Sequence, residues 1–86
     1  MNKIYKYPLE MTATQIIRMP CGTEILHVAE QHGMLCLWAV VDPAAELRDY
    51  VIQIVGNGHP FQRNNKQHLG TVLMGEFVWH VFLVVA

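Results

Sequence analysis

EILHVAEQHGMLCLWAVV, residues 24–41, is the stretch that decides the fold class. Its first eight residues set Ile25 and His27 opposite Leu26 and Val28, as in a strand with two different faces. His32-Gly33 supplies a tight turn, in which glycine adopts positive φ at little cost. The last eight residues are apolar on both faces, which is typical of a central strand. The stretch therefore predicts a β-hairpin with a buried second strand.

Working outward from this hairpin, further runs of β-forming residues are separated by proline, glycine and aspartate. These runs cover residues 1–7, 11–19, 50–55, 68–74 and 77–85. Residues 44–47 allow one helical turn, which is too short to stand alone as a helix. Strands recurring about every 8–12 residues predict an all-β chain of about seven mostly antiparallel strands, a small sandwich or partly open barrel. We expect residues 1–86 to form a single β domain.

Composition adds an expectation about association. Hydrophobic residues make up 52% of the 86 residues, above the usual figure of about 45–50%. A chain this short buries only about 60–65% of its unfolded surface. The excess predicts a dense core or a face covered by another copy, and we expect a homo-oligomer, because small β proteins often cover exposed edges in this way.

The cysteines and the apolar segments bear on the compartment. Cys21 and Cys36 form no metal or redox motif, and lysines interrupt the N-terminus before an apolar run develops. Residues 77–86 are about half a membrane span and contain His80. We expect a cytoplasmic protein, in the cytosol of a host cell, with reduced thiols and no membrane association. A disulfide between the two cysteines remains an alternative.

Charge is unevenly distributed along the chain. The formal net charge is −1, which gives no basic field to attract nucleic acid. No acidic residue lies between Asp49 and Glu76, and this interval holds Arg63 and Lys66 with His68 beside them. Such a segment is suited to a small anionic ligand or an acidic partner. The alternative, a solvated loop kept polar for solubility, is the commoner case, and two firm positive charges are too few for tight duplex binding.

The segment Gly56–Phe61 is the first candidate site. Gly56, Asn57 and Gly58 let a backbone approach an anion closely, and His59 could donate a hydrogen bond to it. It is not a phosphate loop, because the Gly-Lys-Ser/Thr ending and the following helix are missing. An ordinary turn, in which Asn57 tolerates a left-handed conformation, is the commoner explanation.

Trp79 and His80 form the second candidate, together with Trp38. Phe77 and Trp79 share one face of the last strand, and His80 lies on the other. An aromatic face open to solvent would stack on a base or a similar ring. The alternative is that the tryptophans fill the core and His80 is a core or interface histidine.

Metal and enzyme chemistry have little support. Histidines and cysteines are present, but none has the spacing of a zinc site, and we expect no metal and no cofactor. No nucleophile–base arrangement is readable, and a chain of this size rarely encloses a deep active site. We expect no enzymatic activity and no catalytic residues. The predicted ligand-binding residues are Gly56, Asn57, Gly58, His59, Arg63, Lys66, His68, Trp79 and His80.

Several segments in combination carry a resemblance that covers nearly the whole chain. They are YKYPL (5–9), CLWA (36–39) with VDP (41–43), IVGNGHP (54–60), GT (70–71) and VWHVF (78–82). Their order resembles a family of short, uncharacterised proteins with a domain of unknown function, encoded by bacteriophages and prophages. The resemblance implies a phage or prophage accessory protein, and it implies no activity. The tail 83–86 is more apolar than that family would suggest.

Together these observations predict a non-enzymatic accessory binding protein that antagonises host defence. It would bind a host protein, or sequester a small anionic, nucleotide-like ligand. The alternative is a virion-associated or assembly subunit whose apolar C-terminal strand pairs with neighbours and takes no small ligand. The net charge of −1 argues against nucleic-acid binding, which would show as a salt-dependent interaction.

Overall fold

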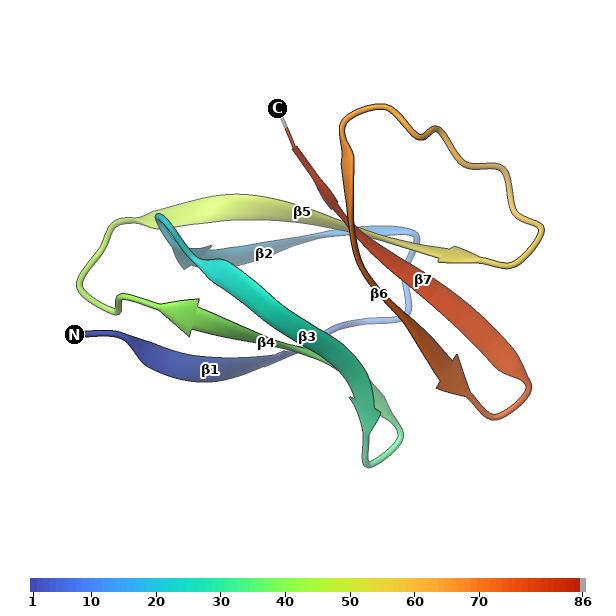
Figure 1. Cartoon of the computed structure of the whole chain (residues 1–86), viewed down its shortest axis with the longest axis horizontal. Coiled ribbons are helices and arrows are strands. Elements are labelled where there is room, and N and C mark those ends of the chain that lie inside the picture. Colours follow the sequence, from blue (N-terminus) through green and yellow to red (C-terminus); the bar gives the residue numbers. More distant parts are fainter. Residues whose placement is uncertain (86) are drawn as a thin grey trace.

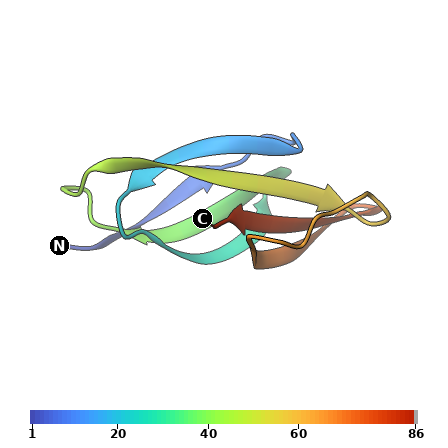
Figure 2. The ribbon, with the colours of Figure 1, turned by 90° about the horizontal axis from the view of Figure 1, so that it is seen from above.

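The protein is a two-layer β sandwich, seen in a computed structural model that describes residues 1–85 (Figure 1). Its strands are β1 (Lys3–Pro8), β2 (Thr14–Pro20), β3 (Glu24–Gln31), β4 (Met34–Val41), β5 (Leu47–Gly56), β6 (Lys66–Met74) and β7 (Phe77–Val84). One sheet has the order β1-β4-β3 and the other β2-β5-β7-β6, with every pairing antiparallel. Figure 2 shows β2 and β5 lying over β1, β4 and β3. The all-β prediction is confirmed.

The hairpin that decided the fold class has the predicted bounds. Gln31 pairs with Met34, and both turn residues have positive φ, 53° at His32 and 80° at Gly33. This is the two-residue turn whose twist matches that of the strands. Glu30 Oε2 accepts a hydrogen bond from the Gly33 amide at 3.1 Å. Strand β4 lies between β1 and β3, so the prediction of a central strand is confirmed.

Other strand boundaries differ from the predicted ones for local reasons. Strand β2 begins at Thr14, because Gln15 bonds both the amide and the carbonyl of Glu10 and folds the preceding residues into a loop. Strand β5 begins at Leu47, since its polar start pairs with β2 and Asp49 forms an ion pair with Arg18 at 3.2 Å. Likewise β1 begins at residue 3, β6 at residue 66, and β7 ends at residue 84.

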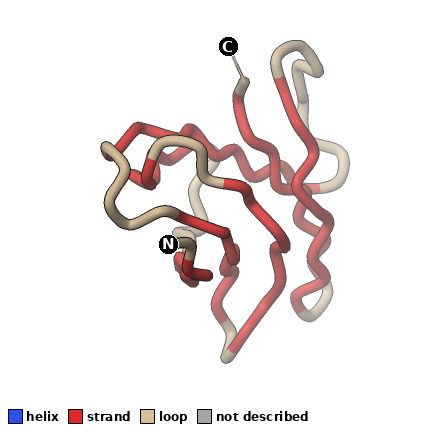
Figure 3. Tube along the Cα trace, turned by 60° about the vertical axis from the view of Figure 1, so that its left-hand side comes forward, coloured by secondary structure: helices blue, strands red, loops and turns tan. Residues whose placement is uncertain are grey.

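The helical turn considered for residues 44–47 is wrong. The chain makes a turn there, in which the Asp42 carbonyl accepts from the Ala45 amide at 3.0 Å and its carboxylate accepts from the Ala44 amide at 3.1 Å. An aspartate at the start of a turn offers the backbone these bonds without a helix. Figure 3 shows strand and loop only over residues 1–85, which contain no helix able to cross a membrane.

The core lies between the inward faces of the two sheets. From β4 it takes Leu35, Leu37, Ala39 and Val41, and from the other sheet it takes Met19, Ile52, Ile54, Val72 and Val81. Alternate residues of each strand point inward, which is how a two-layer sandwich buries one face of each sheet. The molecule is thin as a result, with a shortest extent of 16 Å.

The two sheets meet along one edge, where β3 lies beside β6. The pairing of β6 with β7 shifts register between His68 and Gly70. A Cβ atom at Gly70 would lie 2.5 Å from Cγ2 of Val28, whose side chain is buried. Glycine is therefore required for β6 to approach β3 this closely.

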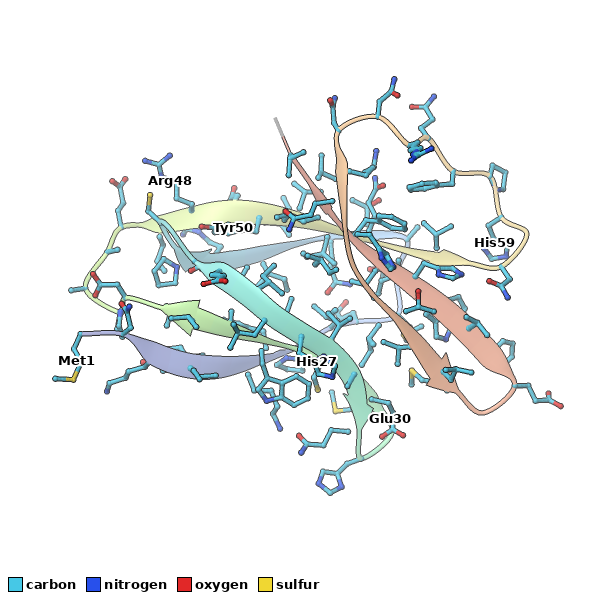
Figure 4. The ribbon with its side chains drawn as sticks, viewed as in Figure 1. Met1, His27, Glu30, Arg48, Tyr50 and His59 are labelled. Atoms are coloured by element: carbon cyan, nitrogen blue, oxygen red, sulfur yellow. The ribbon has the colours of Figure 1, made fainter. Side chains whose placement is uncertain are left out.

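One end of the sandwich is closed by a tyrosine. The Tyr50 ring packs against the core, and its hydroxyl donates to the Pro20 carbonyl at 2.9 Å. The same hydroxyl accepts from the Thr23 amide at 3.4 Å. We call this the closed end, defined by Tyr50, Pro20 and Thr23 (Figure 4). Here β5 is tied to the turn between β2 and β3.

Candidate ligand-binding cleft

At the opposite end lies a cavity of about 600 Å³, which we call the interlayer cleft. Four segments line it: residues 11–13 before β2, the β3–β4 turn, the end of β5 with His59, and the β6–β7 hairpin. Its apolar side chains are those of Met11, Ala13, Ile54, Met74, Phe77 and Trp79. The volume is in the range of small-molecule sites, about 300–1,000 Å³.

The walls of the interlayer cleft expose apolar surface. Phe77 is 61% exposed and Met11 is 49% exposed. The rings of Phe77 and Trp79 stack, with centroids 5.8 Å apart and planes 22° from parallel. Covering such a concave apolar surface with an apolar ligand is favourable by about 25 cal/mol for each Å² removed from water. The cleft therefore has the physical character of a binding site.

A tight turn brings His59 to the cleft. The His59 amide donates to the Gly56 carbonyl at 3.2 Å, and Gly58 has a φ of 81°, as a type II turn requires at its third residue. A Cβ at Gly56 would lie 3.1 Å from both His59 Cε1 and Trp79 Cζ3. Glycine thus lets the two rings converge over the backbone. The His59 amide is committed to the turn, so it does not serve as an anion donor.

The two basic side chains of the following loop have different surroundings. Lys66 Nζ donates to the Asn64 carbonyl at 3.1 Å and, with His59 and Phe61, lines a second cavity of about 330 Å³. Arg63 is exposed, and its side chain has no hydrogen bond or ion pair within residues 1–85. The Phe61 ring packs on that of Phe82, with centroids 4.4 Å apart and planes tilted by 30°, which holds the loop against β7. Only Lys66 adds a firm positive charge to a cavity here.

A chain of hydrogen bonds crosses the outward face of the four-stranded sheet. His80 Nε2 lies 2.6 Å from Asn57 Oδ1, and His80 Nδ1 lies 2.9 Å from the Thr71 hydroxyl. That hydroxyl lies 3.1 Å from His68 Nε2. Since the Asn57 oxygen can only accept, His80 donates to it from Nε2, and a neutral His80 ring then accepts at Nδ1 from Thr71. These side chains satisfy one another and tie the loop to the sheet.

The structure therefore divides the predicted site residues into separate groups. Gly56, His59 and Trp79 lie at the interlayer cleft, and Asn57, His68 and His80 belong to the outward hydrogen-bond chain. Gly58 serves the turn, and Arg63 and Lys66 lie on the loop. No shared platform forms between the two tryptophans, because Trp38 lies on the outward face of the other sheet, 6.2 Å from His27 between ring centroids.

Sequence reasoning missed the residues that complete the cleft. Met11, Glu30, Met74 and Phe77 come from three separate segments. The sequence analysis placed Met11 in the predicted strand 11–19, and nothing in the pattern places it beside Phe77. For Phe77, its position two residues before Trp79 on one strand face was an available signal.

The thiols and possible metal ligands are scattered. Cys21 is exposed and Cys36 is buried, and both are free, so the alternative of a disulfide between them is wrong. Within residues 1–85, no three histidine, cysteine, aspartate or glutamate side chains gather as metal ligands would.

Fold and site define the chain as a small all-β sandwich with an apolar cleft between its layers. The whole chain, residues 1–86, matches the model of a family described as a domain of unknown function, DUF7352, and it belongs to that family. The prediction of an uncharacterised family is confirmed at this level. The searches of curated proteins and of solved structures each found no match.

Proposed function

We propose that this protein is a non-enzymatic binding protein that holds a small apolar ligand in the interlayer cleft. The observation that carries the proposal is a cavity of about 600 Å³ whose walls include exposed apolar side chains, Phe77 and Met11 among them. Filling such a concave surface with an apolar ligand is favourable, because it removes apolar side chains from water.

Binding is favoured over catalysis by the polar groups of the cleft. The polar side chains that line the cleft are those of Thr12, Glu30 and His59. One Glu30 oxygen is held by the Gly33 amide, and the Thr12 hydroxyl lies 3.3 Å from the Thr14 carbonyl. A nucleophile activated by a neighbouring base would need the two groups within about 3.2 Å of one another. The Thr12 hydroxyl and the Glu30 carboxylate instead each support their own loop.

An anionic ligand is the second candidate. It is favoured by the cavity of about 330 Å³ that Lys66, His59 and Phe61 line, which offers a charge, an imidazole and an aromatic ring to a nucleotide-like molecule. Arg63 adds little, since it is exposed on the loop and lines none of the three cavities around His59.

The proposed biological role rests on the resemblance to phage and prophage proteins. In this role the protein is an accessory factor in the host cytosol that antagonises host defence by sequestering its ligand or by covering a host protein. The competing role is a virion or assembly subunit. The predicted pairing of its C-terminal strand with neighbours is wrong, because β7 lies between β5 and β6 and has no free edge. The competing role is favoured by two apolar side chains on the outward face of the four-stranded sheet. Ile16 is 59% exposed and Leu73 is 73% exposed.

The test uses a neutral aromatic probe, 3-phenylpropanol, titrated into ¹⁵N-labelled protein. We expect the indole N–H signal of Trp79, in the cleft, to move in a saturable way. The indole signal of Trp38, on the outward face of the other sheet, serves as an internal control and should not move. Movement of neither indole signal, or equal movement of both, would contradict binding in the cleft.

A matched pair of variants locates the site. Phe77→Ala removes a cleft wall, whereas Leu73→Ala removes an exposed apolar side chain from the partner strand outside the cleft. We expect Phe77→Ala to weaken binding about tenfold, roughly 1.4 kcal/mol, and Leu73→Ala to leave it unchanged. In parallel, ATP binding that is lost in Lys66→Ala would support the second candidate, and its absence would remove it.

A further inference from the structure

The interlayer cleft has a carboxylate but no firm cation in its lining. Glu30 contributes the carboxylate, and none of the lining residues is a lysine or an arginine. Figure 4 shows Glu30 near the β3–β4 turn, on a different part of the chain from His59. The fold therefore brings the acidic side chain of Glu30 to the cleft from a hairpin outside the acid-free interval of the sequence.

The position of the Glu30 carboxylate is fixed by its own hairpin. Glu30 pairs with Leu35, whose side chain is in the core, so Glu30 lies on the inward row of β3. Its Oε2 accepts from the Gly33 amide at 3.1 Å. A carboxylate has lone pairs on two oxygens, so Oε1 is left to accept from a ligand. An ammonium group is the donor that pairs best with it.

The aromatic wall favours the same kind of ligand. The faces of the Trp79 and Phe77 rings carry negative quadrupole charge, and tryptophan is the ring that attracts cations best. Around this wall, Ile54 and Met74 supply apolar surface for the body of a ligand. A neutral ligand would use the apolar surface alone, and an anion would face Glu30.

We infer that the interlayer cleft selects small organic cations, molecules with an ammonium group on an aromatic or aliphatic body. This inference rests on the proposed function and specifies the chemical class of its ligand. The ligand inferred here has the opposite charge to the anionic ligand that the sequence suggested. The reason is that the cleft takes Glu30 from the β3–β4 hairpin and takes neither Arg63 nor Lys66 from the basic loop.

The experiment compares three probes of nearly equal shape, 3-phenylpropylammonium, 3-phenylpropanol and 3-phenylpropanoate. Dissociation constants come from the Trp79 indole signal at pH 8, above the range in which histidines ordinarily titrate. We expect the ammonium compound to bind about three- to tenfold more tightly than the alcohol, and the carboxylate more weakly than both. Added salt should reduce the advantage of the ammonium compound.

Glu30→Gln is the deciding variant, because its amide oxygen can still accept from Gly33 while the charge is removed. It should abolish most of the preference for the ammonium compound over the alcohol. Glu24→Gln makes the same change in charge on the same strand, about 20 Å away by strand rise, and should keep the preference.

The two proposals fail in different ways. If the alcohol binds but the ammonium compound binds no better, or if Glu30→Gln keeps the preference, the inference about charge is wrong and the binding cleft stands. If none of the three probes moves the Trp79 signal, the proposed function itself is wrong.

Discussion

The two ends of the sandwich use aromatic side chains in opposite ways. At the closed end, the Tyr50 ring packs on the core and its hydroxyl bonds to Pro20 and Thr23. At the other end, Phe77 and Trp79 stack on each other and leave a cavity of about 600 Å³ in front of them. Figure 4 shows Tyr50 and His59 toward opposite ends of the long axis. A fold of this size fills one end of its core and leaves the other available to a ligand.

The largest expected effect separates the two ends by stability. Tyr50→Ala removes core packing and two hydrogen bonds, and we expect it to lower the free energy of unfolding by about 3 kcal/mol. Phe77→Ala, at a side chain that is 61% exposed, should cost less than about 0.5 kcal/mol. Urea denaturation of both variants measures the contrast. Equal losses would mean that the cleft end is as much a part of the core as the closed end.

The next effect concerns the edge that joins the sheets between these ends. Gly70→Ala would place a Cβ 2.5 Å from Val28 Cγ2, and a β-branched, buried valine has little freedom to turn away. We expect a loss of about 2 kcal/mol. In a Val28→Ala background the added methyl has room, so the same substitution should cost much less. Additive losses in the double variant would show that Val28 is not the obstacle.

Whether a feature of the fold could be predicted from the sequence depends on how far apart in the chain its interacting residues lie. The hairpin turn at His32-Gly33 and the shared face of Phe77 and Trp79 follow from local rules, φ preference and strand alternation, and both are present. The glycine of β6 was also a local signal, since glycine inside a strand marks a close backbone approach. Boundaries failed where side chains such as Gln15 bond to the backbone.

The site itself was only half accessible from the sequence. His59 and Trp79 were predicted, but they were grouped with Arg63 and His80 because those residues are close in the chain. Strand alternation places Trp79 and His80 on opposite faces, and the sandwich then brings Glu30 to the Trp79 side. Charge counted along the chain therefore differs from charge around a cavity, which depends on how two distant hairpins are packed.

A smaller effect isolates the Tyr50 hydroxyl, whose hydrogen bonds distinguish the closed end. Tyr50→Phe keeps the ring and removes the hydroxyl, leaving the Thr23 amide without this acceptor. We expect a loss of about 1 kcal/mol in the free energy of unfolding. Tyr5→Phe is the matched control, because no hydrogen bond of the Tyr5 hydroxyl is found among the residues that the structure describes. A change as large in the control would assign the loss to tyrosine hydroxyls generally.

The smallest effect uses pH to probe Tyr7, a half-buried tyrosine of the three-stranded sheet that does not line the cleft. Burial raises the pKa of Tyr7 above its ordinary value of 10.0, and neighbouring Tyr5 raises that pKa further. The folded protein therefore holds this proton more tightly than the unfolded chain does. The resulting stabilisation is complete below pH 10 and is lost as the pH rises through the folded-state pKa.

Above pH 10, the free energy of unfolding should therefore decrease less steeply with pH in Tyr7→Phe than in the unmodified protein. Urea denaturation from pH 9 to 11 measures this difference. Because burial is the larger cause, Tyr5→Phe should flatten the decline only in part. If Tyr5→Phe flattened the decline as much as Tyr7→Phe, repulsion between the two phenolates would outweigh burial, and Tyr7 would be more open to water than its packing on the core indicates.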